Sequence, residues 1–186
     1  MVGWIILAAL AAIALWLIAT FNGLVSLKNQ TLNGWKQIDV QLKRRHDLIP
    51  NLVETVKGVM SFEQKTLTQV IEARNKAIAA QGIADKAAQE NVLSGALRQL
   101  FALVENYPNL KSNENVSRLQ EELSSTENRI GFARQFYNDI ATKFNIAQQT
   151  FPTNMIAGML GFHPAELFEI TQSAEREVPK VDLNLK

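Results

Sequence analysis

The sequence predicts an all-α protein: an N-terminal single-pass transmembrane helix followed by an antiparallel up-and-down four-helix bundle with one very long helix. Three observations lead to this fold class. No charged side chain precedes Lys28, and two later stretches place apolar residues alternately three and four positions apart, which is the spacing of a helix face. No stretch alternates between apolar and polar residues as a half-buried strand does. Amphipathic helices joined by short turns pack antiparallel.

The N-terminal segment is long enough to cross a membrane. Residues 2–19 read VGWIILAALAAIALWLIA, and about 20 apolar residues at about 1.5 Å each match a hydrocarbon core of about 30 Å. A signal peptide would show a basic start and a shorter apolar region. We therefore expect an uncleaved anchor at residues 1–27, with Trp4 and Trp16 at the membrane interfaces. A buried core helix is the alternative.

Two heptad stripes predict the bundle at residues 28–150. The first comprises Trp35, Ile38, Leu42, Arg45, Ile49, Leu52, Val56 and Val59. The second comprises Val116, Leu119, Leu123, Thr126, Ile130, Ala133, Tyr137, Ile140, Phe144 and Ala147. Asn113 is a suitable N-cap and Pro152 ends the second pattern, which predicts a helix of about 36 residues, about 54 Å long. Shorter helices are expected near residues 62–81 and 85–106.

Residues 151–186 break the helical pattern. Residues 151–168 read FPTNMIAGMLGFHPAELF, which is apolar, glycine-rich and too short to span a bilayer. We expect this segment to cap the end of the bundle; contact with a membrane or a partner is the alternative. The tail at residues 176–186 contains Pro179 and is expected to be extended.

The composition excludes several classes of function. The formal net charge is +1, so no overall field favours nucleic acid. The chain has no cysteine and two histidines far apart in sequence, which leaves little for metal chemistry. No zinc-protease, serine-hydrolase, phosphate-binding or dinucleotide motif occurs. We therefore expect a protein that is not an enzyme, with no catalytic, metal or cofactor-binding residues and no cofactor.

The stretch KRRHDLIP, residues 43–50, contains the one charged member of the first stripe, Arg45. A buried guanidinium needs a carboxylate or a route to water. Arg74 occupies a similar position on the next helix, and Thr126 with Glu127 lies opposite on the long helix. These four residues form a candidate buried polar layer, in which Glu127 is the expected partner of an arginine. The layer can fix helix register or bind an anion, and self-neutralisation favours register.

Pro50 follows this layer directly. A proline inside a helix removes one hydrogen bond to the preceding turn and clashes with its carbonyl. We therefore expect a helix kink near residues 46–50.

Four blocks of the sequence resemble the bacterial LemA family. They are WKQIDVQLKRRHDLIPNLVETVKG (35–58), IEARNKA (71–77), LKSNENVSRLQEELSSTENRIGFARQFYNDIATKFN (110–145) and REVPKVDL (176–183). The resemblance implies a short membrane anchor followed by an antiparallel helical bundle, without established catalytic residues. It also implies an accessory or scaffold protein of the bacterial envelope, in some members associated with membrane protease systems.

The expected function is a non-enzymatic, membrane-anchored scaffold or adaptor that self-associates in the membrane plane. Its partners would be the lipid bilayer, further copies of the chain and other envelope proteins. An anion- or metabolite-sensing bundle that uses the Arg/Glu layer is the alternative, and an accessory factor acting on a membrane protease system is a third. Lys28 and Lys36 follow the anchor, so the positive-inside rule places the body on the cytoplasmic side of the bacterial inner membrane.

Overall fold

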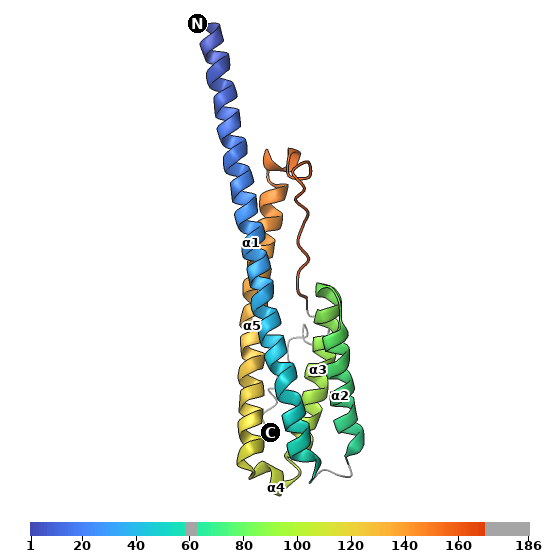
Figure 1. The fold of residues 1–186 in the computed structure, drawn as a ribbon. Coiled ribbons are helices and arrows are strands. Elements are labelled where there is room, and N and C mark those ends of the chain that lie inside the picture. Colours follow the sequence, from blue (N-terminus) through green and yellow to red (C-terminus); the bar gives the residue numbers. More distant parts are fainter. Residues whose placement is uncertain (59–62, 170–186) are drawn as a thin grey trace, which may run out of the picture. The chain divides into compact units, whose positions relative to one another are not determined.

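The computed structural model describes residues 1–58 and 63–169, and its described part is helical with no strand. The helices are α1 (Val2–Lys57), α2 (Gln64–Ala79), α3 (Ile83–Val104), α4 (Pro108–Lys111) and α5 (Glu114–Gln149), followed by a 3-10 turn at Thr153–Met155. The predicted all-α class, the long apolar N-terminal helix and the very long helix, α5, are confirmed (Figure 1).

The long helix α5 begins where the sequence predicts. The Asn113 side-chain Oδ1 accepts hydrogen bonds from the backbone N–H groups of Asn115 and Val116 at 3.0 and 3.3 Å. These bonds satisfy two of the donors that the first turn of a helix leaves unpaired. The helix is 36 residues long, as expected from its heptad stripe.

The predicted anchor and the first predicted bundle helix form a single helix. The apolar N-terminal stretch leads directly into the first heptad stripe, and α1 is continuous over 56 residues. Pro50 lies inside this helix, which continues to Lys57, and the kink remains a prediction.

Contacts divide the chain into two compact units. The first unit contains residues 1–51 and 118–168, and the second contains, among the described residues, 52–58, 63–117 and 169. The boundaries expected from sequence, at residues 27 and 150, separate membrane, bundle and cap, and they remain a prediction. The expected extended tail at 176–186 lies outside the described residues, as does Val59.

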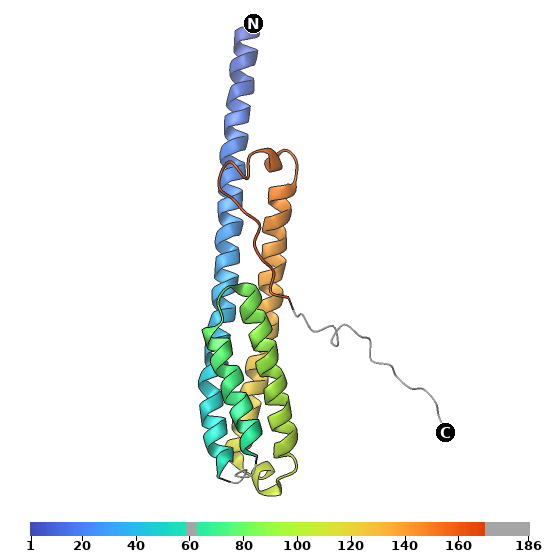
Figure 2. The same cartoon turned by 90° about the vertical axis from the view of Figure 1, so that its right-hand side faces the viewer.

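The first unit pairs α1 with α5 in opposite directions (Figures 1 and 2). Heptad residues of both helices form its core, with Ile38, Ile49, Ile130 and Tyr137 all at most 3 % exposed. The two backbones approach closely at Gly34, where an added Cβ would lie 3.3 Å from the Tyr137 Cα. A larger residue at this position would push the helices apart.

An extended segment, residues 162–168, runs back along this helix pair; we call it the strap. Asn145 donates to the Ala165 carbonyl at 2.9 Å and accepts from the Ala165 N–H at 2.7 Å. Asn138 bonds the Phe168 carbonyl and N–H in the same way, at 3.1 and 2.9 Å. Seven helical residues span about 10.5 Å and three extended residues about 10 Å, so the two spacings match.

Tyr137, the residue before Asn138 on α5, also holds the strap. Its hydroxyl donates to the backbone carbonyl of Glu166 at 2.6 Å. Burial raises the pKa of the Tyr137 phenol, and the negative charge of Glu166 raises this pKa further. The phenol is therefore neutral at ordinary pH and remains a hydrogen-bond donor.

The second unit is built around the consecutive helices α2 and α3. Both helices bury small and aliphatic side chains, namely Leu67, Val70, Ala73 and Ala77 on α2 and Ala87, Leu93, Leu97, Leu100 and Val104 on α3. Gly82 adopts a positive φ of 77° immediately before α3, a conformation that other residues rarely accept. The Tyr107 hydroxyl donates to Glu63 Oε1 at 3.4 Å, which joins the residue before α2 to the residue before α4.

Candidate functional site

The apolar part of α1 is the first candidate site. Among the described residues, α1 is the one helix long and apolar enough to cross a membrane, with a mean hydropathy of 2.6 over its best window and none of that window buried. Trp4 is 77 % exposed, whereas Trp16 is half-buried. Since apolar side chains in this number are unfavourable in water, this surface requires a bilayer or a protein partner.

The second candidate is the polar layer around Arg45. The Arg45 side chain is 4 % exposed, and its Nη1 lies 3.0 Å from Oε2 of Glu127, the partner that the heptad count named. The Glu127 side chain is 48 % exposed, so the pair has one buried and one solvated end. Thr126 is 1 % exposed, and its hydroxyl donates to the Glu122 carbonyl of the preceding turn at 2.7 Å.

Arg74, the fourth member of the predicted layer, belongs to a different compact unit from the other three. Arg45, Thr126 and Glu127 belong to the first unit, and Arg74 belongs to the second. There it is half-buried, and its Nη1 donates to Asn75 Oδ1 at 3.4 Å. Within the first unit, Arg45 pairs with Glu127 next to the buried Thr126. The four-residue layer and its role in register or in ligand binding remain predictions.

The third candidate is an open groove between α1 and α5 in the first unit. Its volume is about 530 Å³. It is lined by Lys36, Gln37, Val40, Gln41, Arg129, Phe132, Ala133 and Phe136. Val40, Phe132 and Phe136 are 63, 74 and 44 % exposed, so the groove presents apolar side chains to its surroundings.

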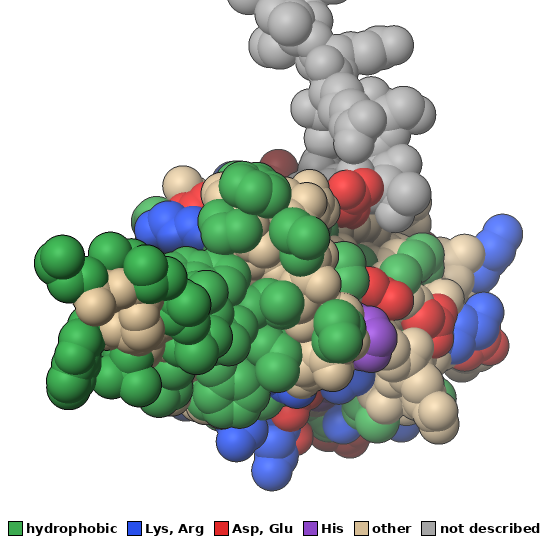
Figure 3. Space-filling model, turned by 90° about the horizontal axis from the view of Figure 1, so that it is seen from above, with side chains coloured by type: hydrophobic (Ala, Val, Ile, Leu, Met, Phe, Trp, Pro, Cys, Tyr) green, Lys and Arg blue, Asp and Glu red, His purple; other side chains and the backbone are tan. Residues whose placement is uncertain are grey.

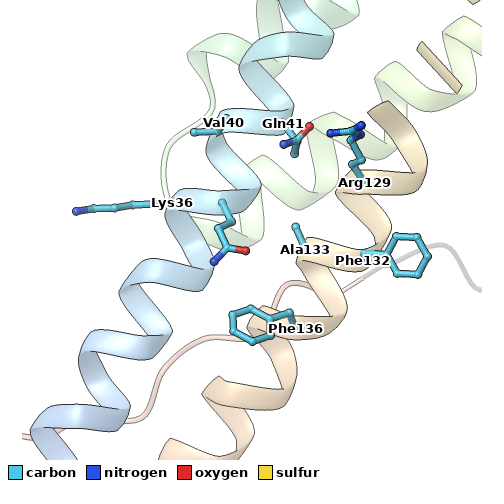
Figure 4. A pocket seen from close by; sticks show the side chains of 8 residues that line it. Lys36, Val40, Gln41, Arg129, Phe132, Ala133 and Phe136 are labelled. Atoms are coloured by element: carbon cyan, nitrogen blue, oxygen red, sulfur yellow. The ribbon is translucent and has the colours of Figure 1, made fainter. Parts of the chain in front are cut away.

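The polar side chains of this groove have a defined arrangement (Figure 4). Gln41 and Arg129 point toward each other across the groove, and Lys36 points away from it. The Gln41 Oε1 atom is buried and has no hydrogen-bond partner in the described part of the chain. An unsatisfied buried carbonyl is costly and accepts a donor readily.

Sequence reasoning missed this groove because it followed the buried stripes. Phe132 and Phe136 are four residues apart on α5 and therefore share a helix face, but neither belongs to the heptad stripe. Large aromatic residues outside the buried stripe of an otherwise polar helix were the available signal.

No group of three or more histidine, cysteine, aspartate or glutamate residues that could hold a metal ion occurs within residues 1–58 and 63–169. Two arginines of the first unit, Arg44 and Arg45, pair with glutamates of α5. Arg44 Nη2 lies 4.0 Å from Glu122 Oε2, with both side chains substantially exposed. Exposed pairs of this kind contribute little to stability.

A long apolar N-terminal helix joined to a helical bundle defines a membrane-associated helical protein. The LemA family model matches residues 34–183, and the chain belongs to this family. It is 28 % identical over 167 residues to Protein LemA of Metamycoplasma hominis, covering 88 % of this chain and 73 % of that protein.

Two further relatives carry a different name. Magnetosome protein MamQ 2 of Paramagnetospirillum magneticum is 25 % identical over 190 residues, covering 88 % of this chain and 70 % of that protein. Magnetosome protein MamQ of Magnetospirillum gryphiswaldense is 24 % identical over 186 residues, covering 86 % and 68 % respectively. The family resemblance predicted from the four sequence blocks is thus confirmed.

Proposed function

We propose that the chain is a non-enzymatic scaffold, anchored in the bacterial inner membrane by α1, that self-associates through the groove of its first unit. The observation that carries the proposal is the groove itself, with three apolar side chains exposed at one helix pair. The apolar start of the same helix α1 provides the means of anchoring.

A second copy of the chain is the proposed occupant of the groove. Copies anchored by the same helix share one orientation and one height relative to the bilayer. Each groove then meets its equivalent at a high effective concentration, so that weak contacts are sufficient for assembly. Val40, Phe132 and Phe136 would supply apolar contact with the same side chains of the neighbouring copy.

The orientation of the scaffold is also a proposal. Lys28 and Lys36 lie on the C-terminal side of the apolar stretch. By the positive-inside rule, these lysines support a body on the cytoplasmic side.

Among the described residues, the anion-sensing alternative gains no further observation. The guanidinium of Arg45 faces the carboxylate of Glu127, which compensates its charge without a ligand. The relatives named LemA and MamQ are compatible with a scaffold in that their names state no reaction.

The test is the mass of the full-length protein after gentle extraction from its membrane, measured by mass photometry. The wild type should form assemblies, and Phe132→Asp should shift them toward the monomer. Val92→Asp is the matched control because Val92 is 52 % exposed on α3, outside the groove. A monomeric wild type at every concentration would refute self-association, and unchanged assembly of Phe132→Asp would refute the groove as its surface.

A further inference from the structure

We infer that the loop at residues 151–160 inserts its apolar tip into the same bilayer surface that α1 enters, giving the first unit a second membrane contact. This inference rests on the proposed anchor and adds a residue-level contact with lipid. The four side chains concerned are Phe151, Met155, Met159 and Leu160, which are 75, 67, 87 and 40 % exposed.

The position of the loop along α1 matches the end of the membrane span. A span of about 20 residues that begins at Val2 ends near Phe21. The Phe21 ring packs against Phe162, immediately after the loop, with centroids 5.8 Å apart. Leu24, one helical turn further, lies in a buried cluster with Ala157 and Phe162. The loop is therefore fixed at the level where α1 leaves the hydrocarbon.

The exposed tip is held by a well-packed base. Ala157 and Phe162 are 4 and 6 % exposed. Backbone hydrogen bonds close the turn, from the Ala157 N–H to the Thr153 carbonyl at 2.9 Å and from the Phe162 N–H to the Ala157 carbonyl at 3.1 Å. Met155 and Met159 thus project from an ordered turn and are available to a surface outside the molecule.

The loop and the start of α1 both lack charged side chains. No aspartate, glutamate, lysine or arginine occurs between Lys143 and Glu166, nor before Lys28 in α1. Two segments far apart in sequence therefore lack charge at the same end of the first unit. Figure 3 looks onto the end where α1 begins, and hydrophobic side chains cover the helix end and much of the surface beside it.

Lipid is the partner that this surface fits best. Uncharged apolar side chains at the level of the headgroups insert about 5–10 Å deep, into the boundary between the headgroups and the acyl chains. Lys28, whose Nζ lies 5.8 Å from the Phe162 ring centroid, stands at the base of the loop. A cation at that level is favoured by anionic headgroups.

The test measures the depth of a nitroxide label in the full-length protein, reconstituted in phosphatidylcholine vesicles that contain phosphatidylglycerol. The natural chain has no cysteine, so Met155→Cys and Met159→Cys each provide one labelling position at an exposed side chain. Leu10→Cys reports the hydrocarbon core, and Asn128→Cys reports water. Asn128 lies on α5 about 30 Å before the helix end that leads into the loop.

Labels at positions 155 and 159 should collide with a water-soluble nickel chelate at most about one fifth as often as the label at position 128. Their collisions with oxygen should be more frequent than those of the label at position 128. Equal nickel accessibility at positions 155, 159 and 128, with the label at position 10 shielded, would overturn the inference and leave the anchor intact. Low accessibility to both reagents would show that protein covers the loop, which also overturns it. A water-accessible label at position 10 would refute the anchor and with it the proposed function.

Discussion

Removing one asparagine that holds the strap should loosen a defined segment of the backbone. Asn145 makes two hydrogen bonds to Ala165, at 2.9 and 2.7 Å. A hydrogen bond of this type contributes about 1 kcal/mol net, so Asn145→Ala should lower the local free energy of opening by about 2 kcal/mol. That difference corresponds to about a 30-fold increase in the population of the open strap.

Amide hydrogen exchange of the full-length protein, followed by mass spectrometry, measures this opening directly. The Ala165 N–H exchanges only when its bond to Asn145 breaks. Exchange in the peptide 162–168 should therefore accelerate by about 30-fold in Asn145→Ala. Asn128→Ala is the matched control, because Asn128 is exposed on the same helix ten residues before Asn138, the nearer of the two asparagines that bond the strap. An unchanged exchange rate in the peptide 162–168 would refute the claim that the two hydrogen bonds of Asn145 hold the strap closed.

Three further predictions concern charged and titratable groups of the first unit. Glu127→Ala should lower the free energy of unfolding by about 1–3 kcal/mol, measured by denaturant titration, because it removes the carboxylate that faces the buried Arg45 guanidinium. Glu121→Ala, at an exposed position of the same helix, is the control, and equal values for both variants would contradict the importance of the pair. The raised pKa of Tyr137 predicts that its contribution to stability is fully present below pH 10 and declines at higher pH, as the unfolded phenol ionises first. In Tyr107→Phe the remaining phenol should titrate, by ultraviolet absorbance, above its ordinary value of 10.0, and a normal midpoint would contradict its burial.

The helices of this chain could be predicted because they depend on local patterns. The heptad stripes identify Ile38, Ile49, Ile130 and Tyr137 as core, and all four are buried. Asn113 was recognisable as an N-cap from its position before the second stripe, and its side chain makes the capping bonds. Periodicity and capping each require only neighbouring residues.

The strap and the groove could not be predicted because they depend on contacts between distant segments. Asn138 and Asn145 are seven residues apart on α5, but nothing in that spacing indicates that residues 162–168 lie beside them. Phe132 and Phe136 are apolar, but only the path of α1 shows that they border an open groove. Glu127 was identified as a partner because its position follows from the register of two helices, which the stripes define.

The continuity of α1 has a mechanical consequence for the first unit. A helix that continues from its apolar start through Asn51 without a linker transmits both tilt and rotation. If the bilayer becomes thinner and the helix tilts to match it, the groove must change direction by the same angle. One residue inserted near Gly23 would turn the groove by about 100° relative to the membrane-embedded face, at almost no change in height. The bilayer would then determine the direction in which each groove faces, and with it the angle at which neighbouring copies meet.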